Sequence, residues 1–265
     1  WRRWGCSVKR KVGLFLLLVM MAVTLGATVV VSLAMYRLVS DKQAQEIRSL
    51  KRGSLQIACA PAMGLSFLPR AVAAFMAKHD QVQISLMVLS SREVVDLVVG
   101  QRCDLGIIVL PNTYPSPRAE KLLATRMLCA LPANHRLRDK TTIQPEDLEG
   151  EAFISYPQSI GSRQHIDSIF AAYGVERTLR LETQLSLPMC AFVEQGLGVA
   201  LVDAISAVEY RGSGVVFRAF EPAIEMDFSM LLPVQGPASK LQVAFLEHMQ
   251  DFIGREVPAG YRFQA

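Results

Sequence analysis

Short apolar runs alternate with longer amphipathic segments along the body of the chain. Residues 55–60, 82–89 and 105–110 are short, apolar and rich in branched side chains, which is typical of buried strands. Between them, 65–78 and 92–100 repeat their apolar positions every three or four residues, as amphipathic helices do. A strand, a helix and a second strand in this order predict a βαβ unit with a right-handed crossover and parallel strands.

The same alternation returns in the second half of the chain and predicts a second α/β unit. No linker rich in Pro, Ser or Gly separates the halves, so we expect two lobes joined by crossing strands, with a cleft where strand ends meet. The pattern predicts strands at 127–131, 152–156, 179–182, 199–203 and 228–232, and helices at 145–148, 162–173, 187–195 and 239–252.

A different pattern precedes the α/β body. Residues 12–36 carry no charged side chain, and as a helix they would measure about 37 Å, enough to cross a hydrocarbon core of about 30 Å. We therefore predict a single transmembrane helix. A cleaved signal peptide, for which this run is too long, and a buried core helix, which is seldom so uniformly apolar, are the alternatives.

The flanks of this run suggest an orientation. The residues that precede the run include Arg2, Arg3, Lys9, Arg10 and Lys11, whereas Arg37, Asp41 and Lys42 follow it closely. This bias of Lys and Arg would keep the N-terminus in the cytoplasm and export the remainder. Within 37–52, residues 40–52 are polar, with apolar positions spaced by three. They predict a helical linker that is either solvated or the tail of a dimerising helix.

Charge is divided unequally between these parts. Residues 1–52 hold 10 Lys and Arg against 2 Asp and Glu, which leaves 18 of the 28 basic and 22 of the 24 acidic residues for 53–265. The body is therefore acidic, at about −4, although the whole chain is at +4. This is not the electrostatic pattern of a surface that binds a phosphate backbone.

The motifs of metal, nucleotide and nucleophilic sites are missing from the sequence. The four His and five Cys show neither C-x-x-C nor H-x-x-x-H spacing, and there is no P-loop, dinucleotide fingerprint or G-x-S-x-G elbow. Gly196-Leu197-Gly198 lies between a predicted helix and a predicted strand, so we interpret it as a helix end with a tight turn. We predict no metal, no cofactor and no enzymatic activity.

Scattered thiols have two implications. Cys59, Cys129 and Cys190 lie in apolar runs, where a reduced cysteine packs as a small core residue. An odd number of unpaired thiols is more typical of a reducing compartment, which conflicts with the exported orientation. The sequence therefore leaves open which side of a membrane the body would occupy.

Polar helix starts follow several predicted strands. Ser90 and Glu93 have the spacing of a capping box, which by itself explains their presence. The free N–H groups and the positive end of the helix dipole at such a position would also attract a carboxylate. Residues 60–64 occupy the equivalent place after the first strand, and 155–159 do so in the second lobe.

Several short motifs follow one another in a recognisable order. They are Gly53-Ser54-Leu55-Gln56-Ile57, Phe67-Leu68-Pro69, Glu93 with 97–100, Cys103-Asp104-Leu105-Gly106-Ile107, 145–150 (PEDLEG) and Cys190 with 196–202. Over about 53–255, their order resembles the effector-binding domain of LysR-type transcriptional regulators, which are bacterial. Ser90-Ser91 together with Gln101-Arg102-Cys103-Asp104-Leu105-Gly106 is similar to the subgroup that senses opines and diaminopimelate.

The resemblance implies an α/β fold like that of type II periplasmic binding proteins. It places lobe I at 53–126 and 228–256, lobe II at 127–227, and a tail at 257–265. Effectors in this family touch the loop after the first strand, the cap after the second, and a Tyr-Pro loop of lobe II. In this chain the corresponding residues are Ala62, Met63, Ser90, Ser91, Tyr156, Pro157 and Ser159. Ala62 has no hydroxyl and could contribute only its backbone.

The resemblance also sets functional expectations. Only 52 residues precede the body, and half of them are apolar, so no winged helix-turn-helix can be placed and we expect this chain alone not to bind operator DNA. We expect an effector-sensing module that lost this domain by truncation, frameshift or fusion, forms a homodimer, and binds a small carboxylate, an amino acid or an opine. The alternative is a membrane-anchored, exported solute receptor of the same fold.

Overall fold

The computed structural model of the chain describes residues 53–110, 119–233 and 237–262. The predictions for 1–11, 12–36 and 37–52, including the membrane-spanning helix, lie outside these residues. Within the described ranges, none of the helices combines the length and the apolar character that crossing a bilayer requires.

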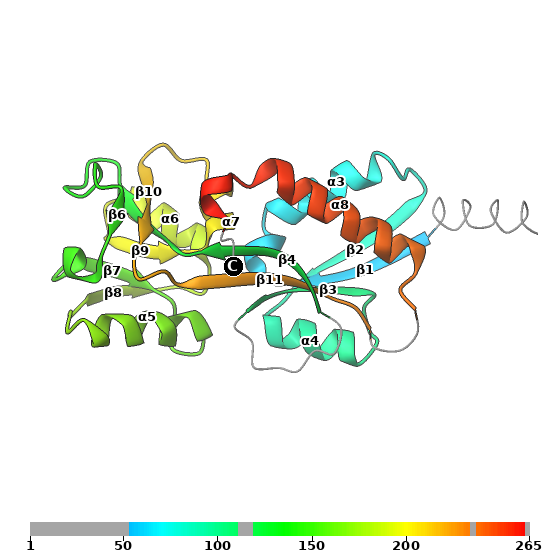
Figure 1. Ribbon diagram of the computed structural model, residues 1–265, viewed down its shortest axis with the longest axis horizontal. Helices are drawn as coiled ribbons and strands as arrows, with labels where there is room; N and C mark the ends of the chain where they lie inside the picture. The colour runs from blue at the N-terminus through cyan, green and yellow to red at the C-terminus, as the bar shows by residue number, and fades with distance from the viewer. Residues whose placement is uncertain (1–52, 111–118, 234–236, 263–265) are drawn as a thin grey trace, which may run out of the picture. The chain divides into compact units, whose positions relative to one another are not determined.

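Lobe I is built on a five-stranded sheet in the order β2-β1-β3-β11-β4 (Figure 1). β1 pairs in parallel with both β2 and β3, which confirms the parallel strands of the predicted βαβ unit, whereas β11 runs antiparallel to β3 and β4. The strands are β1 (Gly53–Cys59), β2 (Val82–Val88), β3 (Leu105–Leu110), β4 (Ala119–Arg126) and β11 (Glu225–Leu231).

Helices cover both faces of this sheet. α3 and α8 pack together on one face, where Phe67 meets Phe252 and Phe75 meets Phe245 edge to face, with ring centroids 5.3 and 5.1 Å apart. α4 covers the other face, close to Gly106, where an added Cβ would lie 2.7 Å from methyl carbons of two α4 valines. The helices are α2 (Pro61–Gly64), α3 (Phe67–Met76), α4 (Ser91–Val99) and α8 (Lys240–Glu256).

Lobe II is built on a six-stranded sheet in the order β6-β10-β5-β9-β7-β8. β7 is parallel to β8 and β9, whereas β5 is antiparallel to β9 and β10. The strands are β5 (Leu128–Pro132), β6 (Thr142–Ile143), β7 (Ala152–Ser155), β8 (Thr178–Glu182), β9 (Val199–Val202) and β10 (Val215–Phe220).

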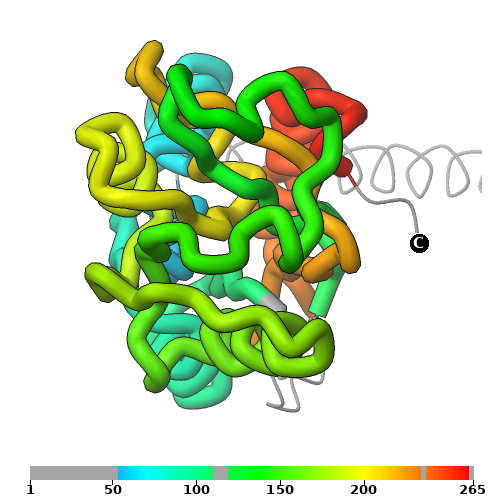
Figure 2. Tube along the Cα trace, turned by 90° about the vertical axis from the view of Figure 1, so that its left-hand side faces the viewer, coloured from blue at the N-terminus to red at the C-terminus, as the bar shows by residue number. Residues whose placement is uncertain are grey.

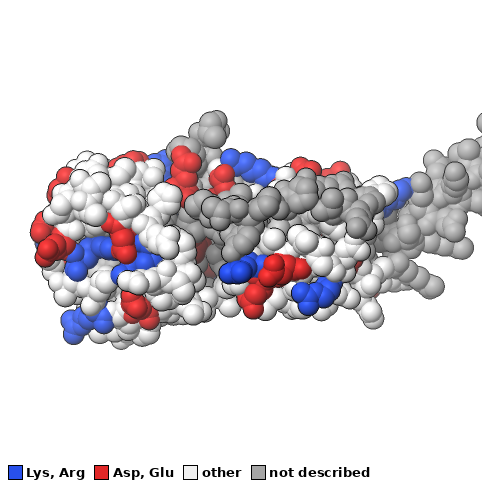
Figure 3. Space-filling model, turned by 90° about the horizontal axis from the view of Figure 1, so that it is seen from below, with Lys and Arg blue, Asp and Glu red and all other residues white. Residues whose placement is uncertain are grey.

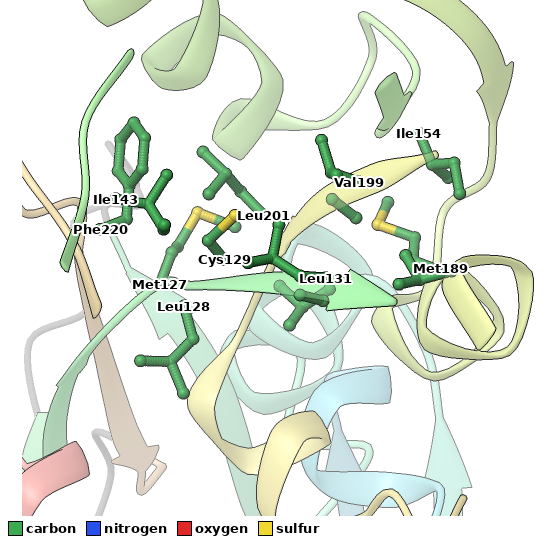
Figure 4. Close-up of a cluster of buried hydrophobic side chains, with 14 of the residues drawn as sticks. Met127, Leu128, Cys129, Leu131, Ile143, Ile154, Met189, Val199, Leu201 and Phe220 are labelled. Carbon is green, nitrogen blue, oxygen red and sulfur yellow. The ribbon is translucent and has the colours of Figure 1, made fainter. Parts of the chain in front are cut away.

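The core of lobe II lies on both faces of its sheet. α5 lies on one face and α6 on the other, as the view from the end of this lobe also shows (Figure 2). Met189 of α6 packs beside Ile154 and Val199, and Cys129 lies fully buried among apolar side chains (Figure 4). The remaining helical elements are α5 (Gly161–Ala172), α6 (Ser186–Glu194), α7 (Ala204–Glu209), η1 (Pro145–Leu148) and η2 (Ala259–Tyr261).

The chain passes between the lobes along neighbouring strands. β4 leads through Met127 directly into β5, and β10 returns to β11, which pairs with β4. The amide of Met127 donates to the carbonyl of Ile224 at 2.9 Å, so the two crossings are bonded to each other. The α/β fold with two lobes joined by crossing strands is therefore confirmed.

Several elements differ from the sequence prediction. β4, β6, β10, α2 and α7 were not predicted, and the helix expected at 65–78 is α3, which spans 67–76. β4 exposes its first three residues, so it has no continuous apolar run, and α7 is too short to show a helical period. The predicted core role of the cysteines is confirmed, since Cys59, Cys129 and Cys190 are all buried, and burial raises the pKa of Cys190 to about 12.

Candidate functional site

The first part of the candidate site lies at the carboxyl ends of β1 and β2. These parallel strands end in register, with Cys59 opposite Val88, and the amide of Leu89 donates to the carbonyl of Cys59 at 3.0 Å. The helix starts that follow, at Ala60 and Ser90, are therefore neighbours on one edge of the sheet. This adjacency is what the sequence pattern predicted for lobe I.

Ser90 forms the predicted capping box at the start of α4. Its Oγ accepts a hydrogen bond from the Glu93 amide at 3.3 Å, and the Glu93 carboxylate accepts from the Ser90 amide at 3.0 Å and the Ser90 hydroxyl at 2.6 Å. The bond from the Ser90 hydroxyl, followed by that from its amide, lowers the pKa of Glu93. Next to it, the Ser91 Oγ accepts from the Val109 amide at 3.2 Å, which ties α4 to β3.

α2 places Ala62 and Met63 beside this edge. Ala62 is half-buried, and its amide belongs to the first helical turn, where N–H groups have no partner within the helix. Met63 is fully buried and packs in the core of lobe I. A ligand contact from Met63 would therefore need its backbone, because its side chain is part of the core.

The second part of the candidate site lies at the carboxyl end of β7 in lobe II. Tyr156 is only 5% exposed, and its hydroxyl lies 2.5 Å from the Ser186 Oγ at the start of α6. Burial is the main cause of the raised pKa of Tyr156. Pro157 is half-buried and Ser159 is exposed, so this loop runs from the core of the lobe to its surface.

The sequence reasoning did not single out Asp203, whose buried carboxyl group interacts electrostatically with Tyr156. Asp203 is the N-cap of α7 and is 2% exposed, and its carboxylate accepts from the amide of Ser206 at 2.8 Å and the hydroxyl of Ser206 at 2.7 Å. The Ser186 hydroxyl donates to it as well. Burial raises the pKa of Asp203, although these hydrogen bonds oppose the shift. The signal in the sequence was an acidic residue at the end of an apolar strand.

Arg163 of α5 fixes the backbone of the Tyr156 loop. Its side chain is buried, and Nη1 donates to the Tyr156 carbonyl at 2.8 Å and to the Glu182 carboxylate at 2.5 Å. Nε donates to both carboxylate oxygens of Asp167 at 2.8 Å. A guanidinium with all of these partners holds the loop at a defined position on the edge of the sheet.

The two edges approach each other at α7. This helix follows β9 in lobe II and lies against α2 of lobe I. Two cavities lie elsewhere: one of about 570 Å³ between β4 and α8, and one of about 380 Å³ beside α5 and β8. None of the seven residues named from the sequence lines either cavity.

Charged side chains of both signs lie on the surface. On the face shown in Figure 3, Lys and Arg lie interspersed with Asp and Glu. Several ion pairs join opposite charges, for example Arg136 with Glu151 at 2.9 Å and Lys140 with Asp147 at 2.5 Å. In such pairs the positive charge is neutralised, so these side chains do not contribute to the continuous basic patch that a phosphate backbone requires.

Comparison with known proteins identifies relatives among transcriptional regulators. Residues 48–253 match the model of the LysR substrate binding domain. The chain is 35% identical over 211 residues to the regulatory protein NocR of Agrobacterium tumefaciens, covering 80% of this chain and 70% of NocR. It is 33% identical to the transcriptional activator protein LysR of Escherichia coli (78% and 67% covered) and 31% identical to the octopine catabolism/uptake operon regulatory protein OccR of Rhizobium meliloti (79% and 69%).

Solved structures show the same fold. The CcmR regulatory domain of Synechocystis PCC6803, in complex with 2-PG, matches with a TM-score of 0.68 at 20% identity, covering 78% of this chain and all of that domain. The BenM effector-binding domain with benzoate matches with a TM-score of 0.63 at 19% identity, covering 80% and 99%. The resemblance found in the sequence is therefore confirmed: the chain belongs to the LysR substrate-binding domain family.

Proposed function

We propose that this chain senses a small carboxylate, an amino acid or an opine between its two lobes. The observation that carries this proposal is the matched placement of helix starts. In each lobe the carboxyl ends of parallel strands lead into Ala62 and Ser90, or into Tyr156 and Ser159, and the two edges meet where α7 lies against α2. Amide groups at helix starts favour an anionic ligand.

The relatives support the chemical class. OccR is named for octopine catabolism and uptake, and octopine carries both carboxylates and basic nitrogens. These relatives are named as regulators, which supports binding without chemical conversion. We propose that the lobes are 53–126 with 228–256 and 127–227, with residues 225–227 at the start of β11 forming the crossing from lobe II into lobe I. We also propose that the chain forms a homodimer and that the ligand changes the angle between lobes.

Ser90 provides the sharpest test of the site. Calorimetric titration of the full chain would use octopine, diaminopimelate and lysine as probes, with benzoate for comparison. In Ser90→Ala we expect the affinity for the probe that binds to fall about fivefold or more, equivalent to about 1 kcal/mol.

Ser239→Ala is the matched control. Ser239 forms the same capping box with Gln242 at the start of α8, on the far side of the lobe I sheet from α4. Both variants should lose about 1 kcal/mol of stability from the cap, but only Ser90→Ala should lose affinity. Equal affinities in both variants would exclude Ser90 from the site, and failure of all the amino-acid and opine probes to bind would contradict the proposed ligand class.

A further inference from the structure

α7 belongs to the cores of both lobes. Ala204 and Ala207 pack in the core of lobe II, from which the helix emerges directly after β9. Ile205, between them, is fully buried in the core of lobe I. A six-residue helix whose opposite sides are packed in different lobes moves with both, so a change in the angle between lobes has to displace or repack it.

The end of α7 is bound to lobe I through a charged group. The Glu209 side chain is only 3% exposed, and its carboxylate accepts a hydrogen bond from Arg70 Nη2 of α3 at 2.8 Å and another from the hydroxyl of Ser66. Arg70 also pairs with Glu256 of α8 at 2.9 Å, within lobe I. Since a buried carboxylate is costly without its partners, Glu209 keeps the end of α7 against α3.

The start of α7 is bound to the candidate site in lobe II. The hydroxyl of Tyr156 lies 2.5 Å from the hydroxyl of Ser186, and Ser186 is also a hydrogen-bond partner of the Asp203 side chain. Asp203 in turn holds the first turn of α7 through Ser206. A continuous buried chain of hydrogen bonds therefore leads from Tyr156 to the start of α7.

We propose that α7 couples the occupancy of the candidate site to the angle between the lobes. The hydrogen-bond chain from Tyr156 positions its start, and the Arg70–Glu209 ion pair makes lobe I follow its end. This inference rests on the proposed function for the identity of the site. The link between α7 and the angle of the lobes is also present in the ligand-free protein. It can be tested without ligand, because two states of α7 would differ in defined contacts at both ends of the helix.

The test measures the distance between the lobes directly. Spin labels at Gln83 of β2 and Gln164 of α5, two exposed positions, report the interlobe distance distribution by pulsed electron paramagnetic resonance. Both are changed to Cys in the full chain with Cys6→Ser, while the buried Cys59, Cys103, Cys129 and Cys190 remain unlabelled.

Two pairs of variants separate coupling from general damage. Glu209→Gln should shift or broaden the distribution, whereas Glu256→Gln, which removes the other partner of the same guanidinium within lobe I, should not. Tyr156→Phe, which cuts the hydrogen-bond chain, should also change the distribution, whereas Tyr173→Phe on the exposed end of α5 should not.

Two results would overturn the proposal. An unchanged distance distribution in Glu209→Gln overturns the role of the ion pair. A changed distribution in Glu209→Gln together with an unchanged one in Tyr156→Phe overturns the coupling to the site. Far-UV circular dichroism confirms that each variant is folded, and Tyr156→Leu, which keeps bulk but no hydroxyl, replaces Tyr156→Phe if that variant unfolds. Because no ligand is added, failure of octopine, diaminopimelate and lysine to bind would contradict the proposed ligand class and leave this result standing.

Discussion

Gly198 lies close to the backbone of a neighbouring strand, and its replacement tests how the turn into β9 is built. Gly198 has φ +148°, and an added Cβ would lie 2.3 Å from the carbonyl oxygen of Ala152 in β7, the strand that pairs with β9. Backbone atoms cannot rotate away as a flexible side chain can. Gly198→Ala must therefore separate the two strands or change the turn.

The magnitude follows from two costs. Overpacking of this kind costs about 1–3 kcal/mol, and the backbone conformation of Gly198, which residues with a Cβ rarely adopt, costs about 1–3 kcal/mol more. We therefore expect Gly198→Ala to lower the free energy of unfolding by about 2–6 kcal/mol, a large share of the stability of a typical domain. Urea unfolding of the full chain, followed by far-UV circular dichroism, measures this difference.

Two other glycines isolate the contributions. Gly196 has φ +73° but open space around its Cβ position, so Gly196→Ala should cost only about 1–2 kcal/mol. Gly254 lies on the exposed side of α8, and a Cβ added to it would have no atom of a neighbouring element within 4 Å. Gly254→Ala should therefore stabilise the chain by about 0.5–1 kcal/mol. If Gly198→Ala cost no more than Gly196→Ala, the close approach to Ala152 would not constrain the turn.

Three further predictions concern pH and the membrane. The pKa of His248 is lowered, mainly by burial. The stability that His248 contributes is therefore present above about pH 6.5 and lost as the pH falls through its folded-state pKa. His248→Gln should remove this acid-dependent loss of stability to urea, whereas His165→Gln, at an exposed position, should not. Burial raises the pKa of Asp203. The stability that Asp203 contributes is therefore present below about pH 4 and lost as the pH rises through its folded-state pKa. The free energy of unfolding of Asp203→Asn, relative to that of the unsubstituted chain, should increase with pH, and a difference that stays constant would contradict this. If 12–36 spans a membrane, an arginine in its middle would raise the free energy of insertion by about 2.5–3.5 kcal/mol. Val23→Arg should then shift the chain from the membrane fraction to the soluble fraction of a cell lysate, and an unchanged distribution would count against the span.

Local features of the site could be predicted from the sequence. The capping box of Ser90 and Glu93 depends on residues three apart, and the helix end at Gly196 depends on a glycine backbone conformation. Both interactions are complete within one helix end, so the spacing of residue types is sufficient to recognise them. The predicted ligand contacts of the seven residues remain predictions.

Contacts between distant residues were beyond this reasoning. Tyr156, Ser186 and Asp203 lie far apart in the sequence and meet only because β7 and β9 are neighbours and α6 begins at their carboxyl ends. Arg70 and Glu209 are 139 residues apart and meet across the lobes. The side chain of Met63 lies in the core of lobe I, which the sequence did not show, because an apolar residue is equally suited to a ligand loop and to a core.

The strand order of lobe I has a consequence for synthesis on the ribosome. β11 lies between β3 and β4, and α8 covers the sheet, so lobe I needs segments from both ends of its sequence. The strands of lobe II are all complete at Phe220, before β11 has been made. A nascent chain can therefore fold lobe II first, while β3 and β4 still lack β11, the strand that lies between them. Lobe I is therefore the part that a premature stop codon or a chaperone would affect most.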